Sequence, residues 1–248
     1  MTSSVGTLDR WLVGSHVPGS AGARLEVKVC GVRSEAEMHI LSRSGVDHAG
    51  VWYGIREVPE SLDAGRLARL CEAAAGGTNV VLVTLGASPV EIARVAREVD
   101  VGAVQLQGFE LPMSVGRLRD ALPARCELWK VLHVTGARCM EDRYLDAYAE
   151  CGADAFVIDA CASRGRVGST GVRVPIEVFA ELARGLGPER VFLAGGLTAG
   201  IVRGLRPHLA MRGVDLDSGV RTRSDPVESS HGRLDRSEIE CLVQAAYG

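Results

Sequence analysis

The sequence predicts a single α/β domain that folds as a closed (β/α)8 TIM barrel. Its 248 residues match the usual length of this fold. Apolar runs of strand length alternate with amphipathic helical segments, as expected of repeated βα units around a parallel sheet. The Gly-x-Gly-x-x-Gly pattern that marks the dinucleotide site of an open doubly wound sheet does not follow the first apolar run. These observations favour the closed barrel over the open sheet.

Eight apolar runs, rich in Val, Ile, Leu and Ala, are the predicted strands. Near-continuous apolar runs of this kind are typical of parallel strands that are covered on both faces. In chain order the predicted strands are Leu25–Cys30, His48–Tyr53, Asn79–Thr84, Ala103–Gln107, Leu128–Val134, Ala155–Asp159, Val191–Ala194 and Gly213–Asp217.

Eight segments with apolar residues at three- and four-residue spacing are the predicted outer helices. Ser34 and Glu37 fit a capping box, and Pro89 suits the first turn of a helix. Gly45 and Gly152 suit helix ends. The predicted helices are Ser34–Ser44, Ser61–Ala75, Pro89–Val99, Gly116–Leu122, Glu141–Cys151, Pro175–Gly185, Ala199–Leu205 and Ser237–Ala246.

The composition favours a small-molecule ligand over a polymer or a membrane. The formal net charge is −3 and no basic stripe is present, so neither nucleic acid nor an anionic membrane surface is an expected partner. The seven cysteines contain no CxxC pair, which is typical of reduced thiols rather than of a metal site or a disulfide framework. We therefore expect a cytoplasmic protein without a metal, present as a monomer or a homodimer.

Residues 1–23 are predicted to be an N-terminal extension, and residues 24–248 the barrel domain. The extension lacks the apolar run and the positive start of a signal peptide. It is rich in Ser, Gly and Pro over residues 14–22, whereas Leu8–Val13 has the pattern of a short docking helix anchored by Trp11.

The chemistry of a βα-barrel is expected at the C-terminal ends of its strands. Cys30 ends the first predicted strand and Asp159 ends the sixth, and both side chains can move a proton. The last two strands run into Gly195-Gly196 and Ser218-Gly219, where bare backbone N–H groups on tight turns can approach a phosphate. The sequence therefore predicts a phosphorylated small molecule as the ligand, with the other six cysteines as buried core residues.

Several different short motifs follow one another along the chain in a characteristic order. They are Lys28-Val-Cys-Gly31, Gln105-Leu-Gln-Gly108, Val157-Ile-Asp159 with Gly168-Ser-Thr-Gly171 after it, Ala194-Gly-Gly-Leu197, Val214-Asp-Leu-Asp-Ser-Gly-Val220 and Gly232-Arg-Leu-Asp235. With these motifs in this order and spacing, roughly residues 25–247 resemble the phosphoribosylanthranilate isomerase family of tryptophan biosynthesis.

The resemblance implies an isomerase that carries out an Amadori rearrangement with neither cofactor nor metal. N-(5-phosphoribosyl)anthranilate becomes 1-(2-carboxyphenylamino)-1-deoxyribulose 5-phosphate. Asp159 is implied as the general acid at the ribose ring oxygen, Cys30 as the general base at C2, and Asp215 as a contact to the arylamine side. These roles require a raised pKa at Asp159 and a thiolate at Cys30 that is favoured by Lys28 or by helix N-termini. The implied phosphate-binding residues are Gly168, Ser169, Thr170, Gly171, Gly195, Gly196, Ser218 and Gly219.

The positions that differ from the family pattern surround the aryl end of the implied substrate. Arg56 is the nearest substitute for the arginine that meets the anthranilate carboxylate, and Gln107 stands where histidine is usual. Arg221 stands where glutamate is common. Tyr53 is a candidate contact to an aromatic substrate.

These differences keep two further functions open, a paralog that acts on a related phosphoribosyl-arylamine and a phosphosugar-binding barrel without turnover. The phosphoribosyl isomerase of the histidine pathway, which performs the same rearrangement on the same fold, is disfavoured. That family uses aspartate at both catalytic strand ends, and here the first is Cys30.

Overall fold

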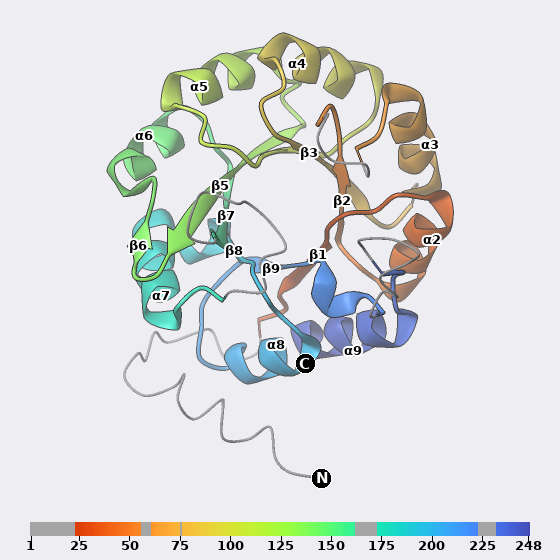
Figure 1. Cartoon of the computed structure of the whole chain (residues 1–248), viewed down its shortest axis with the longest axis vertical. Coiled ribbons are helices and arrows are strands. Elements are labelled where there is room, and N and C mark those ends of the chain that lie inside the picture. The colour runs from red at the N-terminus through yellow and green to blue at the C-terminus, as the bar shows by residue number, and fades with distance from the viewer. Residues whose placement is uncertain (1–22, 56–60, 75, 162–172, 223–231) are drawn as a thin grey trace.

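A computed structural model describes residues 23–55, 61–74, 76–161, 173–222 and 232–248. Within these ranges, parallel strands close into a barrel and helices surround it (Figure 1). The sheet order is β4-β3-β2-β1-β9-β8-β7-β5-β6, and pairing of β4 with β5 closes the ring, which confirms the predicted (β/α)8 fold. The strands are β1 (Glu26–Val29), β2 (His48–Trp52), β3 (Asn79–Thr84), β4 (Ala103–Leu106), β5 (Glu127–Thr135), β6 (Arg138–Cys139), β7 (Ala155–Ala160), β8 (Val191–Leu193) and β9 (Gly213–Leu216).

The helices pack outside the barrel, each between two successive parallel strands or after the last one (Figure 1). Local capping follows the sequence signals: Ser34 Oγ accepts from the Glu37 N–H at 3.3 Å, and Gly45 ends the same helix at φ 78°. The α-helices are α2 (Glu35–Ser44), α3 (Ala64–Ala74), α4 (Pro89–Glu98), α5 (Pro112–Ala121), α6 (Leu145–Glu150), α7 (Ile176–Leu186), α8 (Ala199–Leu205) and α9 (Arg236–Tyr247). Short 3₁₀ turns are η1 (Asp142–Tyr144), η2 (Pro188–Arg190) and η3 (Ser218–Val220).

Three helices begin three or four residues from their predicted starts, and α3 is one of them because it begins at Ala64 rather than at Ser61. Helix α5 begins at Pro112 rather than at Gly116, because the fixed φ of proline suits the first helical position. The predicted helix from Glu141 starts late, as η1 and then α6. The carboxylate of Glu141 instead accepts from the backbone N–H of His133 at 2.9 Å, which keeps Glu141 beside strand β5.

The antiparallel strand β6 was not predicted. Strand β5 runs on to Thr135, turns at Gly136 with φ 59°, and pairs back through Arg138 and Cys139. Gly136 adopts the left-handed conformation that this turn needs. Strand β6 has only two residues, which is too short for a recognisable strand pattern in the sequence.

The barrel interior combines large and small side chains. Trp129 and Phe192 stack with ring centroids 4.7 Å apart, and small residues face them. A Cβ on Gly213 would lie 2.6 Å from the Phe192 ring, so glycine at the start of β9 makes room for that ring. Side chains therefore fill the interior, which is a packed core and not a pore.

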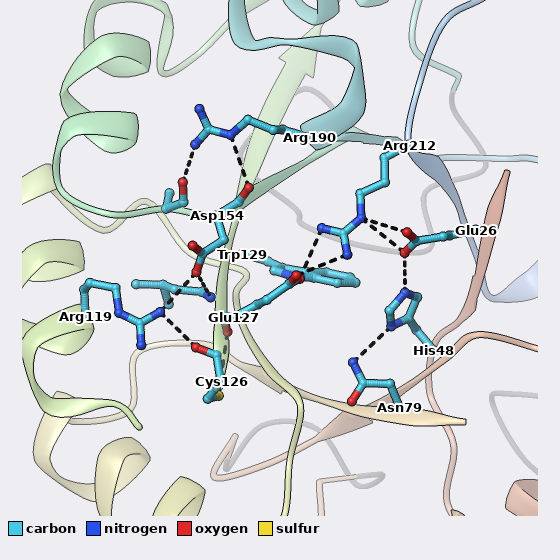
Figure 2. Close-up of polar contacts among 12 residues, drawn as sticks. Glu26, His48, Asn79, Arg119, Cys126, Glu127, Trp129, Asp154, Arg190 and Arg212 are labelled. Atoms are coloured by element: carbon cyan, nitrogen blue, oxygen red, sulfur yellow. Dashed lines mark hydrogen bonds and ion pairs between the residues drawn. The ribbon is translucent and has the colours of Figure 1, made fainter. Parts of the chain in front are cut away.

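A polar network closes the N-terminal end of the barrel (Figure 2). Arg212 pairs with Glu26 and Glu127, both at 3.1 Å, and its guanidinium lies over the Trp129 ring. His48 Nε2 lies 2.6 Å from the second Glu26 oxygen. Side chains from the first residues of β1, β2 and β5 and from the residue before β9 are thus held together at this end.

Most cysteines agree with the expectation of core residues, with one exception. Cys126, Cys139 and Cys161 are buried, and Cys71 and Cys151 pack against the core, but Cys241 is exposed on α9. The exposure of Cys241 corrects the prediction for that residue, because it falls on the outer face of an amphipathic helix. The predicted extension, with Leu8–Val13 and Trp11, lies outside the described residues apart from Ala23. None of the described helices has the length and hydropathy needed to cross a membrane.

Candidate active site

A cavity lies at the C-terminal ends of the barrel strands and collects most of the predicted site residues. It brings Cys30 and Asp159 together, although β9 and β8 separate their strands. Gln107, Asp215 and both predicted glycine turns share the same lining. The lining residues are Cys30, Trp52, Gln105, Gln107, Asp159, Ala194, Gly195, Gly196, Leu197, Asp215, Leu216, Asp217, Ser218 and Gly219.

Cys30 follows β1 and faces the cavity from a tightly packed position. A Cβ on Gly50 of the neighbouring strand would lie 2.9 Å from Cys30 Sγ and 3.0 Å from Lys28 Nζ. Glycine at position 50 therefore gives both groups their space. Burial raises the pKa of the Cys30 thiol to about 12; Lys28 opposes this rise, whereas Asp215 and Asp217 add to it. The expected lowering of this pKa is thus wrong, because burial outweighs the charge of Lys28.

Lys28 forms a buried ion pair with Asp215. Its Nζ lies 2.8 Å from Asp215 Oδ2, and the same ammonium group hydrogen-bonds Cys30. Burial works against the charge on Lys28, but Asp215 and Cys30 raise its pKa above the ordinary value. One cation thus contacts both the candidate base and the acid beside it. The contact between Lys28 and Asp215 joins residues 187 positions apart, so the sequence spacing does not reveal it.

Asp159 at the end of β7 has the protonation behaviour that an acid catalyst needs. Burial raises its pKa to about 6, and the charge of Asp215 adds to the rise, while His133 and Lys28 oppose it. At pH 7 a carboxyl group with this pKa is about one-tenth protonated, far more than an ordinary aspartate, so a proton can be supplied to the reaction. The structure agrees here with the requirement inferred from the sequence.

Two glutamines on β4 and just after it point polar groups into the cavity. Gln105 Nε2 donates to Gln107 Oε1 at 2.9 Å, which leaves the amide nitrogen of Gln107 for other acceptors. The buried Gln105 Oε1 and Asp215 Oδ1 have no hydrogen-bond partner in the described residues. Because an unpaired buried oxygen is costly, both are candidate acceptors for a ligand. Gln105 was not singled out from the sequence, although it lies two residues before Gln107 on the same strand face.

The two glycine turns on the cavity rim approach each other closely. Gly195 and Gly196 have φ of 88° and 60°, a backbone conformation that L side chains rarely adopt. A Cβ on Gly219 would lie 1.9 Å from the carbonyl oxygen of Leu197. The backbone of η3 therefore packs directly on the turn after β8, so that bare backbone surrounds this part of the cavity.

The second strand contributes a different aromatic residue from the one expected. Trp52 lines the cavity, whereas Tyr53 is buried and its hydroxyl lies 3.4 Å from Glu91. Successive strand residues point to opposite faces, so only one of the two can face the interior. Arg56 and Gly168, Ser169, Thr170 and Gly171 lie outside the described residues.

Comparison with known proteins agrees with this architecture. Residues 27–245 match the family model of N-(5'-phosphoribosyl)anthranilate (PRA) isomerase. The N-(5'-phosphoribosyl)anthranilate isomerase of Bacillus velezensis is 30% identical over 227 residues, which cover 88% of this chain and 94% of that protein.

Solved structures share the fold at lower identity. The crystal structure of phosphoribosyl anthranilate isomerase from Thermotoga maritima has a TM-score of 0.72 and 22% identity, and the match covers 90% of this chain and 98% of that one. A phosphoribosyl anthranilate isomerase crystallised with reduced 1-(o-carboxyphenylamino)-1-deoxyribulose 5-phosphate has a TM-score of 0.67 and 21% identity, with the same coverage. By the match of its family model over nearly the whole barrel, this chain belongs to the phosphoribosylanthranilate isomerase family.

Proposed function

We propose that this chain is the isomerase of tryptophan biosynthesis that converts N-(5-phosphoribosyl)anthranilate into 1-(2-carboxyphenylamino)-1-deoxyribulose 5-phosphate. The observation that carries the proposal is the placement of Cys30 and Asp159 in one cavity whose rim is formed by two glycine turns. Family membership supplies the reaction. The relative crystallised with a reduced product analogue supports a substrate of this chemical class.

The first step is opening of the ribose ring. The carboxyl group of Asp159, with its pKa near 6, gives its proton to the ring oxygen as the bond from that oxygen to C1 breaks. The nitrogen lone pair forms the C1=N bond, so the product is a protonated Schiff base and an Asp159 carboxylate. A proton held close to the reacting oxygen contributes about 10²–10⁴-fold to such a step.

The second step removes the proton from C2. The thiolate of Cys30 accepts it, and the C2–H electron pair becomes a C1=C2 bond while the Schiff base nitrogen becomes neutral. The resulting enolamine gains a proton at C1 and loses one from the C2 hydroxyl, which gives the ketone. Because the thiol pKa is about 12, the thiolate is a strong base that needs a cation to form. Lys28 supplies one, and the charge of the Schiff base adds a second.

The remaining site residues are proposed to hold the two ends of the substrate. Gly195, Gly196, Ser218 and Gly219 offer backbone N–H donors to the phosphate, since their turns bring bare backbone to the rim. Gln105, Gln107 and Asp215 line the same cavity, and Asp215 Oδ1 and the two amides are proposed to meet the aryl end of the substrate. Gly168 to Gly171 and Arg56 keep their roles as sequence-based proposals for the phosphate and the carboxylate.

Turnover of the proposed substrate tests this function. Purified protein is incubated with N-(5-phosphoribosyl)anthranilate, and the two isomers are separated by chromatography. Conversion by the parent chain together with growth of a tryptophan auxotroph that lacks this isomerase is the expected result. Absence of both from folded protein contradicts the proposal.

A related phosphoribosyl-arylamine is the second candidate substrate, because Gln107 replaces the usual histidine beside the aryl end. The matched pair of N-(5-phosphoribosyl)anthranilate and N-(5-phosphoribosyl)aniline separates the two substrates. If carboxylate recognition is retained, kcat/KM is higher for the first compound by about tenfold or more, the worth of one charge-assisted contact. Equal values favour the paralog.

A further inference from the structure

We propose that Arg221 is a positioning residue that holds the Cys30 turn in its reactive geometry and joins it to the turn proposed to bind the substrate phosphate. The inference rests on the proposed function and deepens it. By the resemblance, Arg221 stands where glutamate is common in the family.

The side chain of Arg221 is 4% exposed, and its guanidinium contacts five groups from four segments of the chain. Its Nη2 donates to the carbonyl oxygens of Cys30 at 3.0 Å and of Gly31 at 2.8 Å. Its Nε donates to Asp217 Oδ1 at 2.6 Å. Its Nη1 donates to the carbonyl oxygen of Gly232 at 3.1 Å and lies 3.4 Å from Glu37 Oε1.

The backbone after Cys30 is shaped around this guanidinium. Gly31 has φ 76°, and a Cβ there would lie 3.1 Å from Arg221 Nη2 and 3.3 Å from Asp217 Oδ1. Two successive carbonyl oxygens thus converge on one nitrogen, an arrangement that a planar fork of donors can satisfy. Fixing both carbonyl groups fixes the backbone that carries the Cys30 side chain.

The same contact organises charge around the thiol. Two acids, Asp215 and Asp217, disfavour the thiolate of Cys30, and Lys28 favours it. Lys28 pairs with Asp215, and Arg221 pairs with Asp217. Each acid beside the thiol therefore has a cation in direct contact, and loss of Arg221 removes one of the two cations.

Arg221 also follows directly on η3, which begins with Ser218 and Gly219 on the cavity rim. The contact from Arg221 to the Cys30 carbonyl spans 191 residues of sequence. A displacement of the rim turn is therefore transmitted to the strand end that carries the base.

Arg33 provides a matched control. Its Nη2 donates to the same Gly232 carbonyl at 3.3 Å, and it pairs with the same Glu37 at 3.5 Å. The donors to the carbonyl oxygens of Cys30 and Gly31 and to Asp217 described above come from Arg221. R33Q thus removes a cation from the same cluster while Arg221 stays in the chain to make those contacts.

The test compares R221Q, R221K and R33Q with the parent enzyme. Steady-state kinetics gives kcat and KM. A second readout needs no substrate: the rate at which iodoacetamide alkylates Cys30 at pH 9, measured by mass spectrometry relative to the exposed Cys241 of the same molecules. Folded fraction is taken from thermal unfolding.

We expect R221Q to lower kcat by about 30-fold while KM rises less than threefold, since a small misplacement of a catalytic group costs rate rather than binding. Cys30 alkylation is expected to slow severalfold, because alkylation follows the thiolate fraction. R221K keeps a cation near Asp217 and is expected to restore alkylation, yet to leave kcat about tenfold low, because an ammonium group lacks the planar fork. R33Q is expected to stay within twofold of the parent in both readouts.

The proposal is overturned if R221Q and R221K keep parent values of kcat. It is equally overturned if their losses match the loss of folded protein while Cys30 alkylation per folded molecule is unchanged, since Arg221 then has a structural role only. Should R221Q not fold, R221K alone decides. A parent chain that fails to turn over the substrate but shows the alkylation pattern contradicts the proposed function and leaves the positioning role supported.

Discussion

Lys28 and Asp215 are register partners on the adjacent parallel strands β1 and β9, and their buried side chains form an ion pair of 2.8 Å. The pair lies beside the thiol of Cys30 and contributes to its electrostatics. Two charged groups of the candidate active site therefore lie on the two neighbouring strands, β1 and β9, that are the first and the last of the barrel.

Removal of one partner of this pair is expected to destabilise the fold strongly. Lys28→Met leaves Asp215 buried without its cation, at a cost of about 3–5 kcal/mol in the free energy of unfolding. The double variant Lys28→Met/Asp215→Leu is expected to regain most of that stability in urea unfolding while remaining inactive. A double variant no more stable than Lys28→Met contradicts this account of the pair.

Asp159→Asn is expected to lower kcat by about 100-fold or more, because the amide cannot deliver a proton to the ring oxygen. The exposed Asp100, on the outside of the barrel, offers a control: Asp100→Asn is expected to keep parent kinetics. Steady-state assays on both variants measure the difference. Parent activity in Asp159→Asn removes the acid role from this residue.

The raised pKa of Asp159 also predicts how stability depends on pH. The folded group titrates near pH 6 and the unfolded group near 3.8. Between these values the folded protein binds more protons, so its stability falls as pH rises through this window. Relative to the parent, Asp159→Asn is expected to gain stability between pH 4 and pH 8, by about 3 kcal/mol at most. Urea unfolding of both proteins at pH 4 and at pH 8 checks this. The prediction is contradicted if the free energies of unfolding of the variant and the parent differ by the same amount at both pH values.

Cys30→Ala is expected to lower kcat by about 100-fold or more through loss of the base at C2. The fold is expected to tolerate the change because alanine is smaller than cysteine and fits in the space that Gly50 leaves for the thiol. Cys241→Ala, at an exposed position, serves as the comparison and is expected to leave kcat unchanged. Exchange of the C2 proton with solvent deuterium, followed by NMR, reports the same step; undiminished exchange in Cys30→Ala assigns the base elsewhere.

Gly219→Ala is expected to raise KM by about tenfold or more, because its Cβ would lie 1.9 Å from the Leu197 carbonyl oxygen and the rim turn must move. Gly200 lies in helix α8, which comes directly after the Gly195-Gly196 turn. A Cβ there would have open space, with Thr198 Oγ1 nearest at 3.9 Å. Gly200→Ala is expected to keep KM and to stabilise the fold by about 0.5–1 kcal/mol. The inhibition constant of inorganic phosphate, used as a competitive inhibitor, tests the same turn. Equal inhibition constants for the parent and Gly219→Ala contradict phosphate binding by this turn.

The barrel itself was predictable because its signals are local and repeated. Each strand is an apolar run such as Asn79–Thr84, and helix ends carry their own caps, as Ser34 and Gly45 show. The same reasoning placed Cys30 and Asp159 at strand ends, which parallel topology brings to one face. Strand β6 and the divided helix after Glu141 escaped prediction, because the contact between Glu141 and His133 that shapes them arises only in the folded chain.

By itself, the sequence determined the order of the elements and the identity of the groups at the mouth of the barrel, since both follow from periodicity and strand position. Only the tertiary structure decided their chemistry. The pKa values of Cys30 and Asp159 depend on burial and on charges from β1 and β9, and the pairing of Arg221 with the Cys30 turn spans most of the chain. Electrostatic interactions depend on distance in space and on exclusion of water, neither of which is written in the spacing of residues along a chain.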